Sequence, residues 1–138
     1  MGKTGKILAL DVGEKRVGYA VSDETQTVAF PRGTLQRKAD SELIAQIKKT
    51  AEEDGAEKIV IGLPLSEDNL ETPASQSIRE FGEKLAREIT IPIDYIDETF
   101  STAEALKKIP FRKDRRKKGF DDAIAAQVIL ERYLERKI

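Results

Sequence analysis

Residues 7–23 constrain the fold of this chain more than any other stretch. The apolar run Ile-Leu-Ala-Leu ends at Asp11, a turn containing Gly13 follows, and a second apolar segment leads away. This pattern predicts a β-hairpin that holds Asp11 at the end of a buried strand. A carboxylate is costly in such a position unless it is paired or bound to a metal ion. Asp11 is therefore the first candidate functional residue.

The composition limits the chemistry that the chain can perform. Its 138 residues are 39% hydrophobic and 36% charged, which indicates a single globular domain over residues 1–138. The sequence has no cysteine and no histidine, which excludes thiolate nucleophiles, Ser-His-Asp triads and metal sites built from those residues. Hydrolysis would then need carboxylates, lysines, hydroxyls or a metal ion with oxygen ligands. No signal peptide is visible and no apolar run approaches the roughly 18 residues of a membrane span, so we expect a cytoplasmic protein without a membrane partner.

The charge is unevenly distributed along the chain. The formal net charge is −1, yet residues 107–118 hold eight basic residues and one acidic residue. A block with this charge density repels itself, which predicts a loop that can bind phosphate groups of a nucleic acid. The alternative is a charged loop that is merely solvated. The candidate nucleic-acid contacts in this block are Lys113, Arg115, Arg116, Lys117 and Lys118.

The remaining pattern predicts alternating strands and helices. We expect strands at 6–11, 16–23, 58–63 and 91–96, with a short third strand at 26–30 or 33–35 because Pro31 and Gly33 interrupt it. We expect helices at 40–53, capped by Asp40 and ended by Gly55; from the N-cap Thr72 to Glu88; from Ser101 to Lys108; and from Asp121 or Asp122 through Leu134.

This order of elements predicts an α/β fold. An antiparallel meander followed by crossover units gives a mixed five-stranded sheet flanked by helices. Reactive groups in such sheets gather beyond the carboxyl ends of the strands, where Asp11, residues 62–65 and the pair Asp97-Glu98 are expected. Asp11 and Glu98 would meet only if their strands are adjacent, which the sequence leaves open.

Four motifs in this order resemble those of the YqgF family of the RNase H-like superfamily, relatives of RuvC-type Holliday junction resolvases. They are the segment from Leu10 to Asp23, the segment Val60–Leu65, the pair Asp97-Glu98, and the alanine-rich helix from Asp122 to Leu134. The resemblance covers nearly the whole chain and implies an RNase H-like fold with an acidic site of Asp11, Glu98 and Asp122. It also implies a nuclease that processes the 5′ end of the precursor of 16S ribosomal RNA, resolution of branched DNA being the older assignment. The chain departs from the family at Thr99, where the family has arginine.

The acids have both functional and structural interpretations. Clustered carboxylates are oxygen ligands that Mg²⁺ or Mn²⁺ prefers, and two such ions can hydrolyse phosphodiester bonds without histidine or cysteine. Asp11 could instead cap its turn, and Glu98 could only complement a helix dipole. Of the two acids that start the last helix, the family pattern favours Asp122 as the ligand and Asp121 as the cap. Asp97 is expected either to support the ligands or to be solvated.

Two further residues of the hairpin are candidates. Gly13 is expected to supply a positive φ or to let the backbone approach a phosphate, although the turn alone would explain it. Arg16 is expected either to bind a substrate phosphate or to pair with a carboxylate.

The leading hypothesis is a metal-dependent nuclease, and two other classes compete with it. Kinases and ATPases of the actin type also begin with a glycine turn after an aspartate, but their second lobe does not fit in 138 residues. A catalytically silent ribosome-assembly factor would need no acidic site. Junction resolution requires two paired sites and therefore a homodimer, whereas RNA cleavage is compatible with a monomer.

Overall fold

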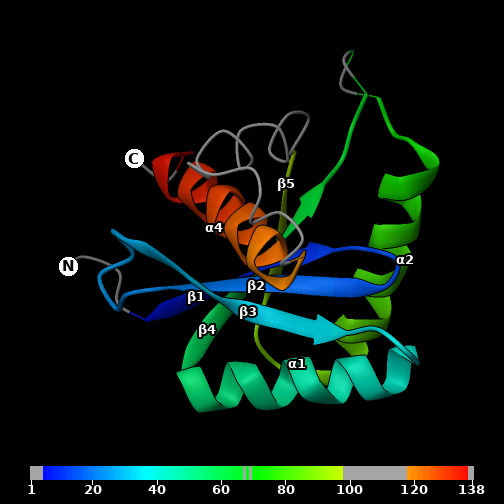
Figure 1. Ribbon diagram of the computed structural model, residues 1–138. Coiled ribbons are helices and arrows are strands. Elements are labelled where there is room, and N and C mark those ends of the chain that lie inside the picture. Colours follow the sequence, from blue (N-terminus) through cyan, green and yellow to red (C-terminus); the bar gives the residue numbers. More distant parts are fainter. Residues whose placement is uncertain (1–4, 67, 69, 98–117, 137–138) are drawn as a thin grey trace.

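The computed structural model describes residues 5–66, 68, 70–97 and 118–136. A five-stranded sheet is covered on one face by α4 and on the other by α1 and α2 (Figure 1). The strands are β1 (Lys6–Val12), β2 (Arg16–Ser22), β3 (Ala29–Gln36), β4 (Ala56–Leu63) and β5 (Ile93–Asp97). The helices are α1 (Asp40–Asp54), α2 (Pro73–Glu88) and α4 (Lys118–Arg136). None of these helices is long and apolar enough to cross a membrane.

The sheet is mixed, as the sequence predicts. Its strand order is β3-β2-β1-β4-β5, with β1, β2 and β3 antiparallel and with β4 and β5 parallel to β1. β4 lies between β1 and β5, so the strand of Asp11 and the strand that ends at Asp97 are not adjacent. At the carboxyl end of β1, Leu10 pairs with Ile61 and Gly62 pairs with Ile96. Gly62 therefore separates β1 from β5 at the level of Asp11.

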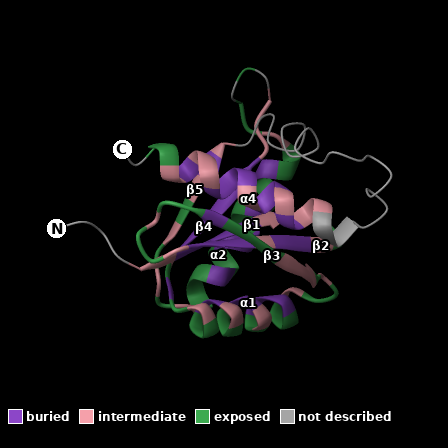
Figure 2. Cartoon of the chain, turned by 60° about the vertical axis from the view of Figure 1, so that its left-hand side comes forward, coloured by how far each residue is buried: buried purple, intermediate pink, exposed green. Residues whose placement is uncertain are grey.

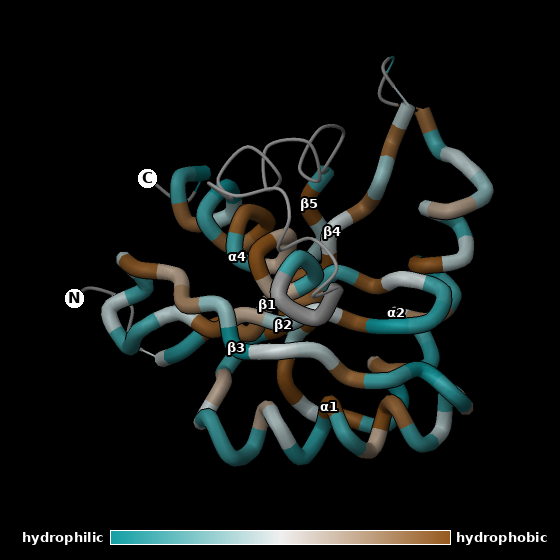
Figure 3. Tube along the Cα trace, in the orientation of Figure 1, coloured by the Kyte–Doolittle hydropathy of each residue, from teal (hydrophilic) through white to brown (hydrophobic). Residues whose placement is uncertain are grey.

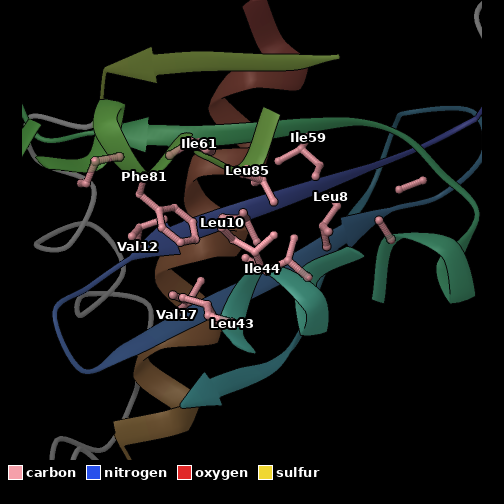
Figure 4. Packing of buried hydrophobic residues seen from close by; sticks show 14 of the residues in the cluster. Leu8, Leu10, Val12, Val17, Leu43, Ile44, Ile59, Ile61, Phe81 and Leu85 are labelled. Atoms are coloured by element: carbon pink, nitrogen blue, oxygen red, sulfur yellow. The ribbon is translucent and has the colours of Figure 1, made fainter. Parts of the chain in front are cut away.

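Alternation along the strands divides the buried side chains into two cores. On the α1/α2 side, Leu8 and Leu10 of β1 belong to a core that also includes residues of both helices, and Phe81 of α2 is almost fully buried there (Figure 4). Burying a side chain of this size contributes about 1.5–3 kcal/mol relative to leaving it exposed. The core on the α4 side, called the α4 core below, consists of Ile7, Ala9, Ala20, Ala29, Val60, Ile96, Ala126, Ile129, Leu130 and Tyr133. Figures 2 and 3 show the result, in which buried and largely apolar central strands lie between helices with polar outer surfaces.

The ends of two helices confirm the sequence analysis. The backbone N–H of Ser75 donates to Thr72 Oγ1 and the N–H of Thr72 donates to Ser75 Oγ, so Thr72 caps α2 ahead of Pro73. Gly55 ends α1 with a φ of 68°, a left-handed conformation that favours glycine.

Three sequence expectations about element ends are wrong. β3 is one continuous strand through Pro31 and Gly33; it tolerates proline because it is an edge strand and one side of it needs no ladder hydrogen bonds. The N-cap of α1 is Ala39, whose methyl group cannot accept a hydrogen bond, and the carboxylate of Asp40 pairs with Arg37 and Lys84. α4 begins at Lys118, so neither Asp121 nor Asp122 starts it. The helix expected at 101–108 lies outside the described residues.

Candidate active site

Asp11 lies near the carboxyl end of β1, on the sheet face covered by α4. The alternation that puts Ile7 and Ala9 in the α4 core carries Asp11 to the same face. Its partner in β2 is Gly18, and the register of β4 brings Gly62 to its other side. Asp11 is thus flanked on both neighbouring strands by residues without side chains.

Asp122 comes to this position from the other end of the chain. It is the fifth residue of α4, which packs against β1, β2 and β3. The start of the helix crosses β2 so closely that a Cβ atom built on Gly18 would lie 2.0 Å from the carbonyl oxygen of Asp122. Sequence analysis missed this contact, although glycine inside a strand is a known signal of close backbone approach.

Arg16 holds the Asp122 side chain from the same strand. Its Nε donates to Asp122 Oδ2 at 2.8 Å, with about a third or less of each side chain exposed. Of the two roles expected for Arg16, the structure shows the pairing with a carboxylate. It fixes the orientation of one carboxylate and neutralises part of its charge.

The charge of Asp122 acts on Asp11 electrostatically. Burial, together with the nearby charge of Asp122, raises the pKa of Asp11 from 3.8 to about 6. A divalent cation would reverse both effects, because it replaces lost hydration and neutralises the repulsion. The donor set, two carboxylates and no nitrogen or sulfur ligand, fits a hard ion such as Mg²⁺ or Mn²⁺. Within the described part of the chain, no group of three acids comes together to hold a metal ion.

The third predicted ligand, Glu98, lies outside the described residues and follows the last residue of β5. Asp97 approaches α4, where its carboxylate lies 3.9 Å from Arg132 Nη2 and 3.6 Å from Arg136 Nη1. Of the predicted nucleic-acid contacts, Lys118 is the first residue of α4. Lys113, Arg115, Arg116 and Lys117 lie outside the described residues.

One alternative for Gly13 and the cap expected of Asp121 require correction. Gly13 does not have a positive φ, so that alternative is wrong. It is suited to the turn because a Cβ atom there would lie 2.8 Å from the carbonyl oxygen of Arg16, which accepts a hydrogen bond from the Gly13 N–H. Asp121 lies within the first turn of α4, three residues after its start, and does not cap the helix.

Solved structures define the class of fold. A structure of RuvC from T. thermophilus in complex with Holliday junction substrate superimposes with a TM-score of 0.60, at 13% identity over 96% of this chain and 95% of that chain. The fowlpox virus Holliday junction resolvase gives a TM-score of 0.58, also at 13% identity, over 96% of this chain and 99% of that chain. The fold is therefore the RNase H-like fold of RuvC-like resolvases.

Sequence comparison identifies the family. Residues 5–136 match the model of the family described as "RuvX: Holliday junction resolvase". A protein of Maridesulfovibrio salexigens with the name "Putative pre-16S rRNA nuclease" is 37% identical over 134 residues, 95% of this chain and 98% of the relative. A relative of the same name from Caldanaerobacter subterraneus is 34% identical over 94% of this chain and 96% of its own length. The chain belongs to the RuvX family.

Proposed function

We propose that this chain is a metal-dependent endonuclease that hydrolyses phosphodiester bonds at the 5′ end of pre-16S ribosomal RNA. The observation that carries the proposal is the convergence of Asp11 and Asp122 from opposite ends of the chain onto one face of the sheet. The RNA substrate is supported by the names of the relatives with 37% and 34% identity. We expect the protein to act in the cytoplasm, because ribosomal RNA precursors are processed there in bacteria such as those that carry these relatives.

Asp11, Glu98 and Asp122 are the proposed ligands. Mg²⁺ or Mn²⁺ supplies, when bound, an activated water and neutralisation of the charge that develops on the phosphate, and a pair of ions can do both. Asp11 must be deprotonated to act as a ligand, which its raised pKa makes dependent on pH. Arg16 keeps the Asp122 carboxylate in one orientation for this purpose.

The place of Glu98 in the sequence supports including it, because this residue directly follows β5, which is separated from β1 by β4 alone. At the level of Asp11 the intervening residue of β4 is Gly62, which has no side chain to fill the space beside Asp11.

The basic segment 107–118 is the proposed phosphate-binding surface. Its last residue, Lys118, begins the helix that carries Asp122 four residues later. Lysine and arginine side chains in this segment would therefore meet a nucleic acid whose scissile phosphate lies at the acids. We propose contacts from Lys113, Arg115, Arg116, Lys117 and Lys118, with the remaining N–H groups of Arg16 as a further contact.

A second candidate is resolution of four-way DNA junctions. The family description and the RuvC-like fold favour it. This activity requires two sites acting together, so the protein would have to form a homodimer. Cleavage of RNA by a monomer would favour the first candidate.

The test incubates labelled 16S precursor RNA and a synthetic four-way junction with the parent protein, with and without Mn²⁺. We expect Mn²⁺-dependent cleavage of the RNA by the parent. Asp11→Asn should bind RNA but cleave at least about 100-fold more slowly, because even groups that only support metal ligands cost 10–100-fold. Asp68→Asn, on an exposed loop, is the control and should cleave normally. Cleavage by Asp11→Asn at the parent rate would refute the metal assignment, and binding without cleavage by the parent would indicate an assembly factor.

A further inference from the structure

We propose that Gly18 is a positioning residue of the metal site, because its missing side chain sets how closely Asp122 approaches Asp11. The inference rests on the proposed metal-dependent function and extends it to a residue that touches neither ion nor substrate. Gly18 is the β2 partner of Asp11, and the backbone of Asp122 lies directly over it. A single glycine thus contacts both acid-bearing elements.

The contact leaves no room for any side chain. A Cβ atom at position 18 would lie 2.0 Å from the carbonyl oxygen of Asp122, 2.4 Å from its carbonyl carbon and 2.8 Å from its Cβ. Non-bonded heavy atoms normally lie about 3.5–4.0 Å apart. An alanine would therefore require the backbone at Asp122 to move by about 1 Å or more, because the clashing atoms include backbone and no flexible side-chain end can rotate away.

The rest of α4 is held by packing, so the movement would fall on its first turns. Ala126, Ile129 and Leu130 are fully buried against the sheet, one to two turns beyond Asp122. Close-packed interiors resist displacement as a unit. The added methyl group would tilt the start of the helix away from β2 and would carry the Asp122 carboxylate away from Asp11.

A displacement of this size matters to a metal ion more than to the fold. Mg²⁺ binds oxygen ligands at 2.0–2.1 Å with near-ideal octahedral geometry, and sites tolerate deviations of about 0.2 Å. Functional constellations work only within about 0.5 Å of the productive geometry. A shift of about 1 Å exceeds both limits, so we expect metal affinity to fall by about tenfold or more, as it does when groups supporting metal ligands are removed.

The experiment measures Mn²⁺ binding to the nucleic-acid-free protein by electron paramagnetic resonance, in the parent, Gly18→Ala and Gly33→Ala. Gly33 is the matched control: it lies in the adjacent strand β3, and the nearest atoms to a Cβ atom there would belong to the Tyr19 side chain, at an ordinary contact distance of 3.5 Å. Both variants make the same chemical change in the same sheet. We expect the Kd of Gly18→Ala for Mn²⁺ to rise by about tenfold and that of Gly33→Ala to stay at the parent value.

A double variant separates positioning from general destabilisation. Asp122→Glu alone should weaken Mn²⁺ binding, because the longer side chain places the carboxylate beyond its position in the parent. In the Gly18→Ala background the same change should strengthen binding, because the extra methylene lets the carboxylate reach the ion from a helix that has moved away. A merely structural role for Gly18 would lower the melting temperature without this reversal of sign.

The outcomes distinguish this inference from the proposed function. If the parent binds no Mn²⁺, the proposed function fails, and this inference fails with it. If the parent binds Mn²⁺ and Gly18→Ala has the same Kd as Gly33→Ala, only the positioning role is overturned. The Mn²⁺-induced rise in melting temperature reports the affinity of a variant that is only partly folded. Loss of any cooperative transition in Gly18→Ala at every Mn²⁺ concentration would assign Gly18 to folding and would also overturn the inference.

Discussion

Arg16 and Asp122 lie 106 residues apart in the chain, and the guanidinium Nε of one donates to the carboxylate Oδ2 of the other at 2.8 Å. This bond joins β2 to the start of α4 beside Asp11. It means that one of the two converging carboxylates already has a cation, whereas Asp11 is half-buried and its pKa is raised. The electrostatic asymmetry between the two acids follows from this arrangement and leads to the first two predictions.

Replacement of Arg16 by glutamine should lower the free energy of unfolding by about 1 kcal/mol in metal-free buffer, near the upper end for ion pairs that are partly exposed. Urea denaturation at low salt measures the loss. Arg79→Gln is the control, because its pair with Glu71 is the more exposed of the two, and it should cost less. If both variants lost the same free energy of unfolding, the partial burial of the Arg16–Asp122 pair would add nothing to its stabilising effect.

The stability of the metal-free protein should carry a contribution from Asp11 that decreases as the pH rises from about 4 to about 6. In this window the folded state holds the Asp11 proton more tightly than the unfolded state, because the folded pKa is about 6 and the unfolded value is 3.8. The folded state therefore binds more protons, and the free energy of unfolding falls with increasing pH. Urea denaturation of the parent and of Asp11→Asn, in buffer with a chelator, measures this. The variant should gain stability relative to the parent above pH 6, and parallel pH profiles would contradict the assignment.

Neutralising four residues of the basic segment, Arg115, Arg116, Lys117 and Lys118, with glutamine should weaken RNA binding at low salt. The slope of log K against log salt concentration should fall by about 3, at roughly 0.7–0.9 for each phosphate that the protein no longer neutralises. Filter binding at several salt concentrations measures the slope. Lys48 and Lys49, exposed on α1 across the sheet from α4, provide a control pair whose replacement should leave it unchanged. An unchanged slope in the fourfold variant would remove the basic segment from the interface.

Thr72→Ala should destabilise the protein by about 1 kcal/mol, within the range measured for N-cap residues. The change removes the hydroxyl that accepts from the Ser75 N–H and that donates to the carbonyl oxygen of Pro64 at 2.8 Å. Thermal or urea denaturation measures the effect. Ser41→Ala, at an exposed position in the first turn of α1, should change the stability by much less. A Thr72→Ala variant as stable as the parent would indicate that the cap bonds add nothing beyond solvation.

Local patterns in the sequence were enough to predict most strands of the sheet. They also predicted the helix termini that depend on residues close together in the chain. Thr72 with Pro73 and the glycine at position 55 fix helix ends through bonds and dihedral angles within a few residues, so their sequence signals are reliable. Pro31 misled the sequence analysis because its effect depends on whether its strand is at an edge, which is a property of the whole sheet.

The sequence by itself determined that Asp11 lies close to the carboxyl end of a buried strand, that the chemistry cannot use histidine or cysteine, and that the fold contains a mixed sheet. The tertiary structure alone decided that β4 separates β1 from β5 and that α4 starts early enough to carry Asp122 over Gly18. It also decided that Arg16 pairs with Asp122. Hairpins and helix caps depend on neighbours in the chain, whereas the meeting of residues 11, 18 and 122 depends on packing between distant elements, which no local pattern records.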